Sequence, residues 1–436
     1  MKRLISLLFA ALIMLSPLML MTSCSSQGSG KVVTLNVYNW GQYISDGSED
    51  SYDTNREFEI YWNENLAEKY GYRIKVNYST YASNEDMYNK LVSGSARYDV
   101  IIPSDYMIQR LISEDMLYEL NPSESLSNYE YIDEEFRTLY YDPDGKYSVP
   151  YAYGVVGVIY NTDYVSEDSD GFGSWNLMWN EEYKGKILQF NNPRDAFGTS
   201  LYRLRYDVNT TSKDEWKRAL DELAVQKPLV QSYVMDEIFN KMSTASSWIS
   251  AYYAGDFLTM HGDNDSLDFY YPTDGTNIYI DAMCIPKNAK TPEAAIEYID
   301  FMLSEDAAVA NAEYTCYATP NRLVYENEEY IEYINDCYGG EAFESGMDIL
   351  YCKTEQITPD TDYSDTDVIH VSYYHSIDNT KENGDLLNYT NDLWETLKIE
   401  DSGSLWVYIT AGIIVALLIG WALYVYITKR RRESKY

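Results

Sequence analysis

Polar, aromatic and acidic side chains follow or interrupt apolar runs at several points where a binding site could form. The segment YNWGQY (38–43) ends a β-branched alternating run, and PSDY (103–106) ends another. Asp281 is a single carboxylate within the apolar segment IYIDAMCIP (278–286). An unpaired charge buried in such a run is costly, so Asp281 would need a partner. Without other evidence, the default interpretation is an aspartate that caps a helix or lies in a turn.

Histidine and cysteine, which often carry catalysis or bind metals, form no such pattern. The three histidines lie at positions 261, 370 and 375, in no zinc-ligand or catalytic-triad spacing. Apart from Cys24 there is no C-x-x-C spacing among the cysteines, which are Cys284, Cys316, Cys337 and Cys352. An exported chain could pair these four thiols, and buried free thiols are an equally good alternative. The pattern counts against zinc hydrolysis and histidine-based catalysis, and we expect no metal, no cofactor and no enzymatic activity.

The chain is strongly acidic, with 69 Asp and Glu against 33 Lys and Arg and a formal net charge of -36. Such a surface repels nucleic acid and concentrates small cations, although solubility alone explains much of the charge. The acidic segments 45–53 and 358–367 lack the glycine and terminal glutamate spacing of an EF-hand. We therefore predict solvated loops there rather than calcium sites.

Both ends of the chain carry membrane signals. Residues 1–24 have a basic start, an apolar run and small residues before Cys24, which predicts a secretory signal with a lipidated cysteine. Residues 25–31 would then be a flexible tether. Residues 405–427 carry no charge and precede a basic tail at 428–436, which predicts one transmembrane helix with a cytoplasmic end. The chain is thus predicted to be held at the cell membrane with its binding domain outside the cytoplasm.

Between these ends, strand-like and helix-like segments alternate. Two-residue periodicity predicts strands and helical spacing predicts helices, in the order strand 32–38, helix 56–70, strand 72–78, helix 85–94 and strand 98–103. A β-rich stretch at 145–160 could carry the chain between two lobes, and the length of 436 residues allows two cores. The alternation favours an α/β sheet that binds ligands at the carboxyl ends of its strands, where 38–43 and 103–106 lie.

A series of segments resembles the spermidine/putrescine-binding lipoproteins of ABC importers, within the periplasmic-binding-protein class. The matches cover roughly residues 31–325 and are LNVYNWGQYI, YSTYASNEDMYNKL, YDVIIPSDYMI, YSVPYAYGVVGVIYN, SWNLMWNEEYKGKI, NNPRDAFGTSL, YVMDEIFNKM, YYAGDFLTM, TNIYIDAMCIPKNAK and AEYTCYATPN. The resemblance implies a type II fold with two α/β lobes, joined by hinge strands and closing on a polyamine. Lobe 1 would comprise 32–152 and 279–322, and lobe 2 would comprise 153–278 and 323–400. The implied partners are ABC permease subunits with their ATPase.

The resemblance also implies a set of ligand-binding residues. These are Trp40, Tyr43, Ser104, Tyr106, Asp195, Tyr252, Tyr279, Asp281 and Tyr317. A polyamine needs carboxylates at its amines, here Asp195 and Asp281, and aromatic walls along its methylenes, which add cation–π attraction. The family carries Trp where this chain has Tyr252 and Tyr279, and one of its patterns has a second acid where this chain has Asn192.

Three other interpretations stay open at this point. The same fold could bind another cationic small molecule, such as a metal chelate, thiamine or a cationic amino acid. Paired carboxylates could instead hydrolyse glycosides, but that requires one acid held protonated, and no pair in the sequence is marked out for it. A membrane-tethered polyamine sensor is the third, which the short tail disfavours.

Overall fold

The computed structural model describes residues 31–377 and 385–399. The predicted signal sequence with Cys24, most of the tether, the predicted span 405–427 and the basic tail lie outside these residues. Within the described ranges, no helix has the length and apolar character needed to cross a membrane. The prediction of a C-terminal transmembrane helix therefore stays a prediction.

The elements alternate along the chain as the sequence predicts. The strands are β1 (Val32–Trp40), β2 (Arg73–Tyr81), β3 (Val100–Ile101), β4 (Ser148–Asn161), β5 (Ile187–Phe190), β6 (Val230–Val234), β7 (Ile249–Tyr253), β8 (Leu267–Tyr270), β9 (Thr276–Cys284), β10 (Thr354–Gln356) and β11 (Ile369–Ser372). The α-helices are α2 (Thr54–Tyr61), α3 (Ala67–Tyr70), α4 (Asn84–Ser93), α5 (Asp105–Ser113), α6 (Pro122–Ser125), α7 (Glu134–Arg137), α8 (Pro193–Arg203), α9 (Lys213–Gln226), α10 (Glu237–Ser243), α11 (Ala254–Asp263), α12 (Pro292–Met302), α13 (Glu305–Thr315), α14 (Arg322–Tyr325), α15 (Glu328–Asp336), α16 (Gly346–Leu350) and α17 (Leu386–Ile399).

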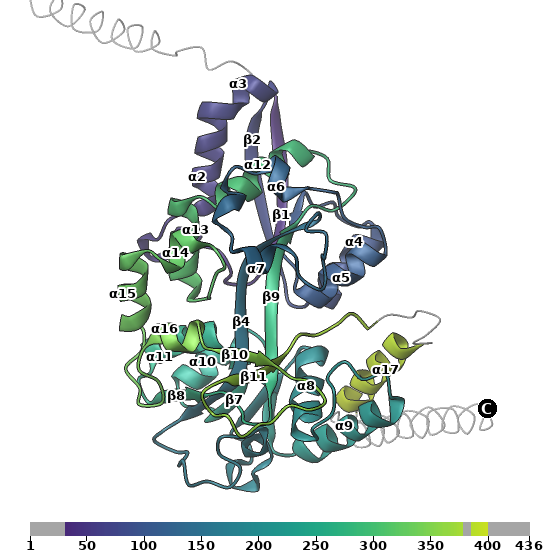
Figure 1. The fold of residues 1–436 in the computed structure, drawn as a ribbon, viewed down its shortest axis with the longest axis vertical. Coiled ribbons are helices and arrows are strands. Elements are labelled where there is room, and N and C mark those ends of the chain that lie inside the picture. Colours follow the sequence, from purple (N-terminus) through teal and green to yellow (C-terminus); the bar gives the residue numbers. More distant parts are fainter. Residues whose placement is uncertain (1–30, 378–384, 400–436) are drawn as a thin grey trace, which may run out of the picture.

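Two long antiparallel strands, β4 and β9, connect the upper and lower parts of the molecule (Figure 1). In the upper part, β9 pairs with β3 through Cys284, and β1 lies parallel to both β2 and β3. In the lower part, β4 pairs with β7 and β8, and β5 joins β7 to β6 in parallel. The strand order β2-β1-β3-β9-β4-β7-β5-β6 therefore passes through both parts, and each part is an α/β unit.

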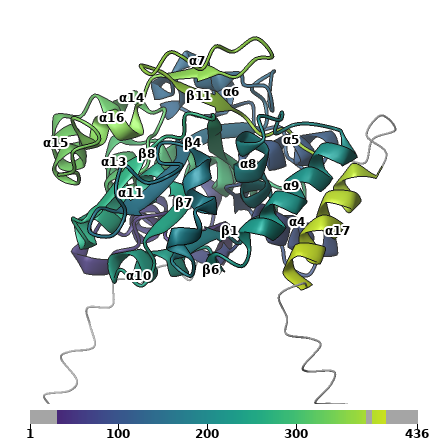
Figure 2. The ribbon, with the colours of Figure 1, turned by 90° about the horizontal axis from the view of Figure 1, so that it is seen from below.

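Helices cover the sheet of each part and close its core. Large side chains are fully buried, among them Trp62 at the start of the π-helical turn between α2 and α3, Trp216 in α9, and Trp175. In the lower part, α9 and α17 pack against each other at one edge (Figure 2). The structure thus has the periplasmic-binding-protein-like architecture that the resemblance implies.

Local signals set several element boundaries. The Ser83 hydroxyl accepts a hydrogen bond from the Asp86 amide and begins α4, and Gly94 ends that helix in the left-handed region. The predicted helix 56–70 is continuous, but its middle, Trp62–Leu66, is a π-helical turn. The predicted strand 98–103 is shorter in the structure, where only Val100–Ile101 pairs in the sheet.

Candidate functional site

A cavity of ≈ 440 Å³ lies where the two parts of the molecule meet beside β9. Its size falls within the usual range for small-molecule sites. All nine residues predicted to bind ligand line it: Trp40, Tyr43, Ser104, Tyr106, Asp195, Tyr252, Tyr279, Asp281 and Tyr317. The structure therefore brings together residues that are as much as 277 positions apart in the chain, from Trp40 to Tyr317.

Strand ends and helix starts place these side chains. Trp40 is the last residue of β1, and Ser104 follows β3 at the beginning of α5. Asp195 lies in the first turn of α8, directly after β5. The two-residue period of β9 turns Tyr279 and Asp281 to the same side, into the cavity. The default interpretation of Asp281 as a cap or turn residue is wrong, since it lies inside a strand.

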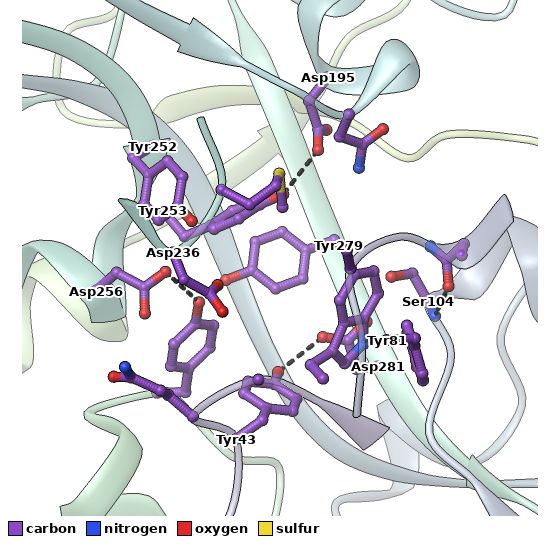
Figure 3. A pocket seen from close by; sticks show the side chains of 18 of the residues that line it. Tyr43, Tyr81, Ser104, Asp195, Asp236, Tyr252, Tyr253, Asp256, Tyr279 and Asp281 are labelled. Carbon is purple, nitrogen blue, oxygen red and sulfur yellow. Dashed lines mark hydrogen bonds between the residues drawn. The ribbon is translucent and has the colours of Figure 1, made fainter. Parts of the chain in front are cut away.

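Each of three carboxylates in the cavity accepts a hydrogen bond from a tyrosine hydroxyl (Figure 3). Tyr43 donates to Asp281 Oδ2 at 2.7 Å, and Tyr253 donates to Asp195 Oδ2 at 2.7 Å. Tyr317 donates to Asp256 Oδ2 at 2.9 Å. The hydroxyls remain donors at physiological pH because burial holds the pKa of each tyrosine well above its usual value. Each carboxylate thus keeps one oxygen fixed by the protein.

The four tyrosines Tyr43, Tyr317, Tyr279 and Tyr253 form a continuous series of edge-on rings, which we call the tyrosine arc. Ring centroids are 5.0 Å apart from Tyr43 to Tyr317, 6.3 Å from Tyr317 to Tyr279 and 5.2 Å from Tyr279 to Tyr253. One end of the arc bonds Asp281 and the other bonds Asp195, with Asp256 bonded between them. The arc is therefore an aromatic wall that separates carboxylates at fixed positions.

Burial changes the protonation of these carboxylates. It raises the pKa of Asp281 to about 6, while the hydroxyls of Ser104 and Tyr43 oppose the rise. It also raises the pKa of Asp195 and of Asp256 to about 7, each opposed by its bonded tyrosine. Acids with raised pKa values gain most from a nearby positive charge, which would restore the ionised form.

Several polar atoms at the cavity are buried and lack a hydrogen-bond partner among the described residues. They are Asp281 Oδ1, Asp105 Oδ2, the Tyr279 hydroxyl and Trp40 Nε1. Buried polar atoms are ordinarily paired, so unpaired ones at a cavity indicate groups available to a ligand. The two carboxylate oxygens are the most informative, because an ionised carboxylate can only accept hydrogen bonds and therefore needs a donor, such as an ammonium group.

The sequence analysis missed part of the cavity wall. Asp256, Asp236 and Tyr253 line it together with the predicted residues. Asp256 occupies the first turn of α11, immediately after β7, so the strand-end rule that selects 38–43 and 103–106 would also have found it. Asn192, which replaces an acid of the family pattern, lines the cavity and caps α8 by accepting from the Arg194 amide at 3.0 Å.

Two other predicted residues that line the cavity also contact its supporting residues. The Tyr252 ring stacks on Phe190 with centroids 5.5 Å apart and contacts the Tyr253 ring, with centroids 4.8 Å apart. Tyr106 directs its hydroxyl to Glu85 Oε1 at 3.1 Å. Among residues 31–377 and 385–399, no cluster of three or more His, Cys, Asp or Glu is arranged to hold a metal ion. The site is thus acidic and aromatic.

Comparison with known proteins agrees with this architecture. The family described as bacterial extracellular solute-binding protein matches residues 62–335. The chain belongs to this family. Its relatives include the spermidine/putrescine-binding periplasmic protein of Escherichia coli, 32% identical over 289 residues, which are 66% of this chain and 78% of the relative.

Two further relatives carry related descriptions. The putrescine/cadaverine-binding protein of Pseudomonas aeruginosa is 28% identical and covers 62% of this chain and 74% of its own length. The solved structure of the spermidine/putrescine ABC transporter substrate-binding protein of Streptococcus pneumoniae is 30% identical. It covers 83% of this chain and 99% of its own, with a TM-score of 0.58. The similarity thus extends over nearly all of the described residues.

Proposed function

We propose that this solute-binding protein captures a polyamine, spermidine or putrescine, outside the cytoplasm and delivers it to an ABC permease. The observation that carries the proposal is the pair of buried carboxylates, Asp195 and Asp281, at the two ends of the tyrosine arc. Their side chains are only 6% and 5% exposed, so water solvates neither charge effectively. A ligand with ammonium groups at both ends and methylenes between them satisfies both carboxylates and covers the rings.

Each part of the ligand has a counterpart in the cavity. One ammonium would donate to Asp281 Oδ1, the oxygen left free by Tyr43. A second ammonium would bind Asp195. Asp256 would accept a hydrogen bond from the third amine of a triamine, or would contact a diamine through water. The rings contribute cation–π attraction of about 0.5–2 kcal/mol where an ammonium lies over a face. This division of roles disfavours ligands with only one cationic group.

The proposed capture step is closure of two lobes. Lobe 1 would comprise 32–152 and 279–322, and lobe 2 would comprise 153–278 and 323–400, with β4 and β9 as the hinge. Trp40 and Asp281 would reach the ligand from the first lobe and Asp195 from the second. Closure would surround the ligand, which strengthens each charge–charge contact by excluding water.

We also propose that the receptor is held at the membrane. The lipid on Cys24 and the helix 405–427 would anchor the two ends, and the permease subunits with their ATPase would be the partners. A single helix cannot form a path for a polar solute, because such a path needs a cavity enclosed by several helices. Transport therefore belongs to the permease, and the receptor itself catalyses no reaction.

Isothermal titration calorimetry tests the ligand. The purified protein is titrated with spermidine, putrescine and cadaverine, and in parallel with lysine, arginine and thiamine. We expect one-to-one binding of a polyamine and at least tenfold weaker binding of the other cations. No heat or thermal shift with any polyamine at millimolar concentration would refute the proposal, and tighter binding of an amino acid or thiamine would favour a different cationic ligand.

A further inference from the structure

Two thiols lie at the ends of helices that pack against each other. Cys316 ends α13 in the left-handed conformation, with φ of 54°, and Cys337 ends α15. The helices α13 and α15 are in contact. Both are free thiols in the structure, Cys316 buried and Cys337 half-buried. The fold thus brings two cysteines, 21 positions apart, to one place.

The two thiols are close enough to perturb each other's pKa, and the Tyr333 hydroxyl affects both. The Cys316 thiol donates a hydrogen bond to the Glu313 carbonyl oxygen at 3.5 Å. The contact with Cys316 lowers the pKa of Cys337, which favours its thiolate. The other cysteines have different surroundings. The Cys284 Sγ lies 3.7 Å from the Ala282 carbonyl oxygen, and the Cys352 thiol interacts with the Tyr271 hydroxyl.

We propose that Cys316 and Cys337 form a disulfide bond in the exported protein, and that this bond fastens the segment that carries Tyr317. The named relatives are periplasmic proteins, and such compartments are oxidising. The bond would close a loop of 22 residues that begins one residue before the tyrosine arc.

The bond would form by exchange with an oxidised thiol–disulfide carrier. The Cys337 thiolate attacks the carrier disulfide, which forms a mixed disulfide and releases one carrier thiol. Cys316 then loses its proton and attacks the Cys337 sulfur, releasing the second carrier thiol. Two hydrogens leave the protein, and the carrier disulfide is reduced to two thiols.

The location gives the bond a role at the cavity. Tyr317 follows Cys316 directly, bonds Asp256 and lies edge-on to Tyr43. The 316–317 segment also packs closely on α11, since a Cβ at Gly255 would lie 2.7 Å from the Cys316 carbonyl oxygen. A disulfide would therefore tie the segment that carries Tyr317 to the end of α15, in addition to its packing on α11.

Peptide mapping of the exported full-length protein tests the bond. Free thiols are alkylated in denaturant without reduction, and digested peptides are identified by mass spectrometry. We expect a linked peptide pair containing Cys316 and Cys337, with Cys284 and Cys352 alkylated. Alkylation of both Cys316 and Cys337, or a link from either to another cysteine, would overturn the proposal.

Two variants test the role of the bond, Cys337→Ser and the control Cys352→Ser. Reduction should lower Tm by about 4 °C in the wild type and in the control, and leave Cys337→Ser unchanged. Cys337→Ser should also weaken spermidine binding several-fold, and equal affinity in all three proteins would refute the fastening role. This last readout rests on the proposed function, whereas the mapping does not. A protein that carries the bond but binds no polyamine would refute the proposed function alone.

Discussion

Polyamine binding should depend on pH through the carboxylates of the tyrosine arc. Burial raises the pKa of Asp195 to about 7 and of Asp281 to about 6 in the empty cavity. An ammonium ligand requires both in the ionised form, so the ligand must displace their protons. Affinity should therefore fall as the pH decreases through 7 and 6, while the primary amines of putrescine, like lysine with a pKa near ~10.4, keep their charge.

The magnitude follows from the two pKa values. Between pH 8 and pH 5.5, ionising Asp195 becomes about 30-fold less favourable and ionising Asp281 about fourfold, so affinity should fall about 100-fold. For putrescine, a diamine that pairs with Asp195 and Asp281, about nine-tenths of Asp195 and half of Asp281 carry a proton at pH 6, so binding should release about 1.4 protons. Near pH 8.5 the release should be close to zero.

Calorimetry in two buffers with different ionisation enthalpies measures the released protons directly. Asp195→Asn should remove its share, about 0.9 proton at pH 6, while the matched substitution Asp265→Asn at an exposed position should leave the release unchanged. Constant affinity from pH 5.5 to 8, with no proton release at pH 6, would show that neither carboxylate binds an ammonium. The reasoning about the cavity would then be wrong.

Three further predictions follow from the same geometry. Asp281→Asn should weaken binding by about 2–5 kcal/mol, because a buried ammonium loses its charged partner. Asn192→Asp preserves the cap of α8 and should change affinity less. Equal effects in calorimetry would show that the roles of these residues are misassigned. High salt should weaken binding only modestly, since screening over about 8 Å acts little on buried charges, and a steep salt dependence of the dissociation constant would contradict a closed cleft. A receptor truncated after Asp401 but still lipidated should support less polyamine uptake by cells at low polyamine concentration than the full chain at an equal receptor level. The reason is that the helix holds the receptor near its permease. Unchanged uptake would make the helix a redundant anchor.

The sequence predicts much of the site because the rule that places it is local. Ligands bind where strands end, and Trp40, Tyr43, Ser104 and Tyr106 all follow strands that can be recognised from their periodicity. Asp195 came only from the family resemblance, since its segment gives no separate signal. The positions of all nine residues around one cavity agree with that assignment, although their contacts with a ligand stay predictions.

The remaining features depend on tertiary structure. Without the resemblance, the segment around Asp281 favours a cap or turn, because the sequence cannot show that Tyr43, 238 positions away, donates a hydrogen bond to Asp281. At the π-helical turn, the Trp62 ring contacts those of Tyr70 and Tyr72, with centroids 4.8 and 5.3 Å apart. The helical periodicity of the sequence does not predict these contacts. The position of Asp256 after a strand could be predicted, but its hydrogen bond with Tyr317, from a distant segment, could not.

The empty cavity and the occupied one should differ in stability as well as in shape. A buried carboxyl whose folded pKa is raised contributes stability at low pH, and that contribution is lost as the pH rises through the folded value. For Asp195 and Asp256 this loss extends from the ordinary value of 3.8 up to about pH 7, and for Asp281 from 3.8 up to about pH 6. At neutral pH the ligand-free protein therefore holds several carboxylates in an unfavourable environment, and mutual repulsion adds to that cost. A polycation removes both effects at once, so the increase in Tm produced by putrescine should be larger at pH 8 than at pH 5.5. The same burial that destabilises the empty site thus makes it selective for ligands that carry more than one positive charge.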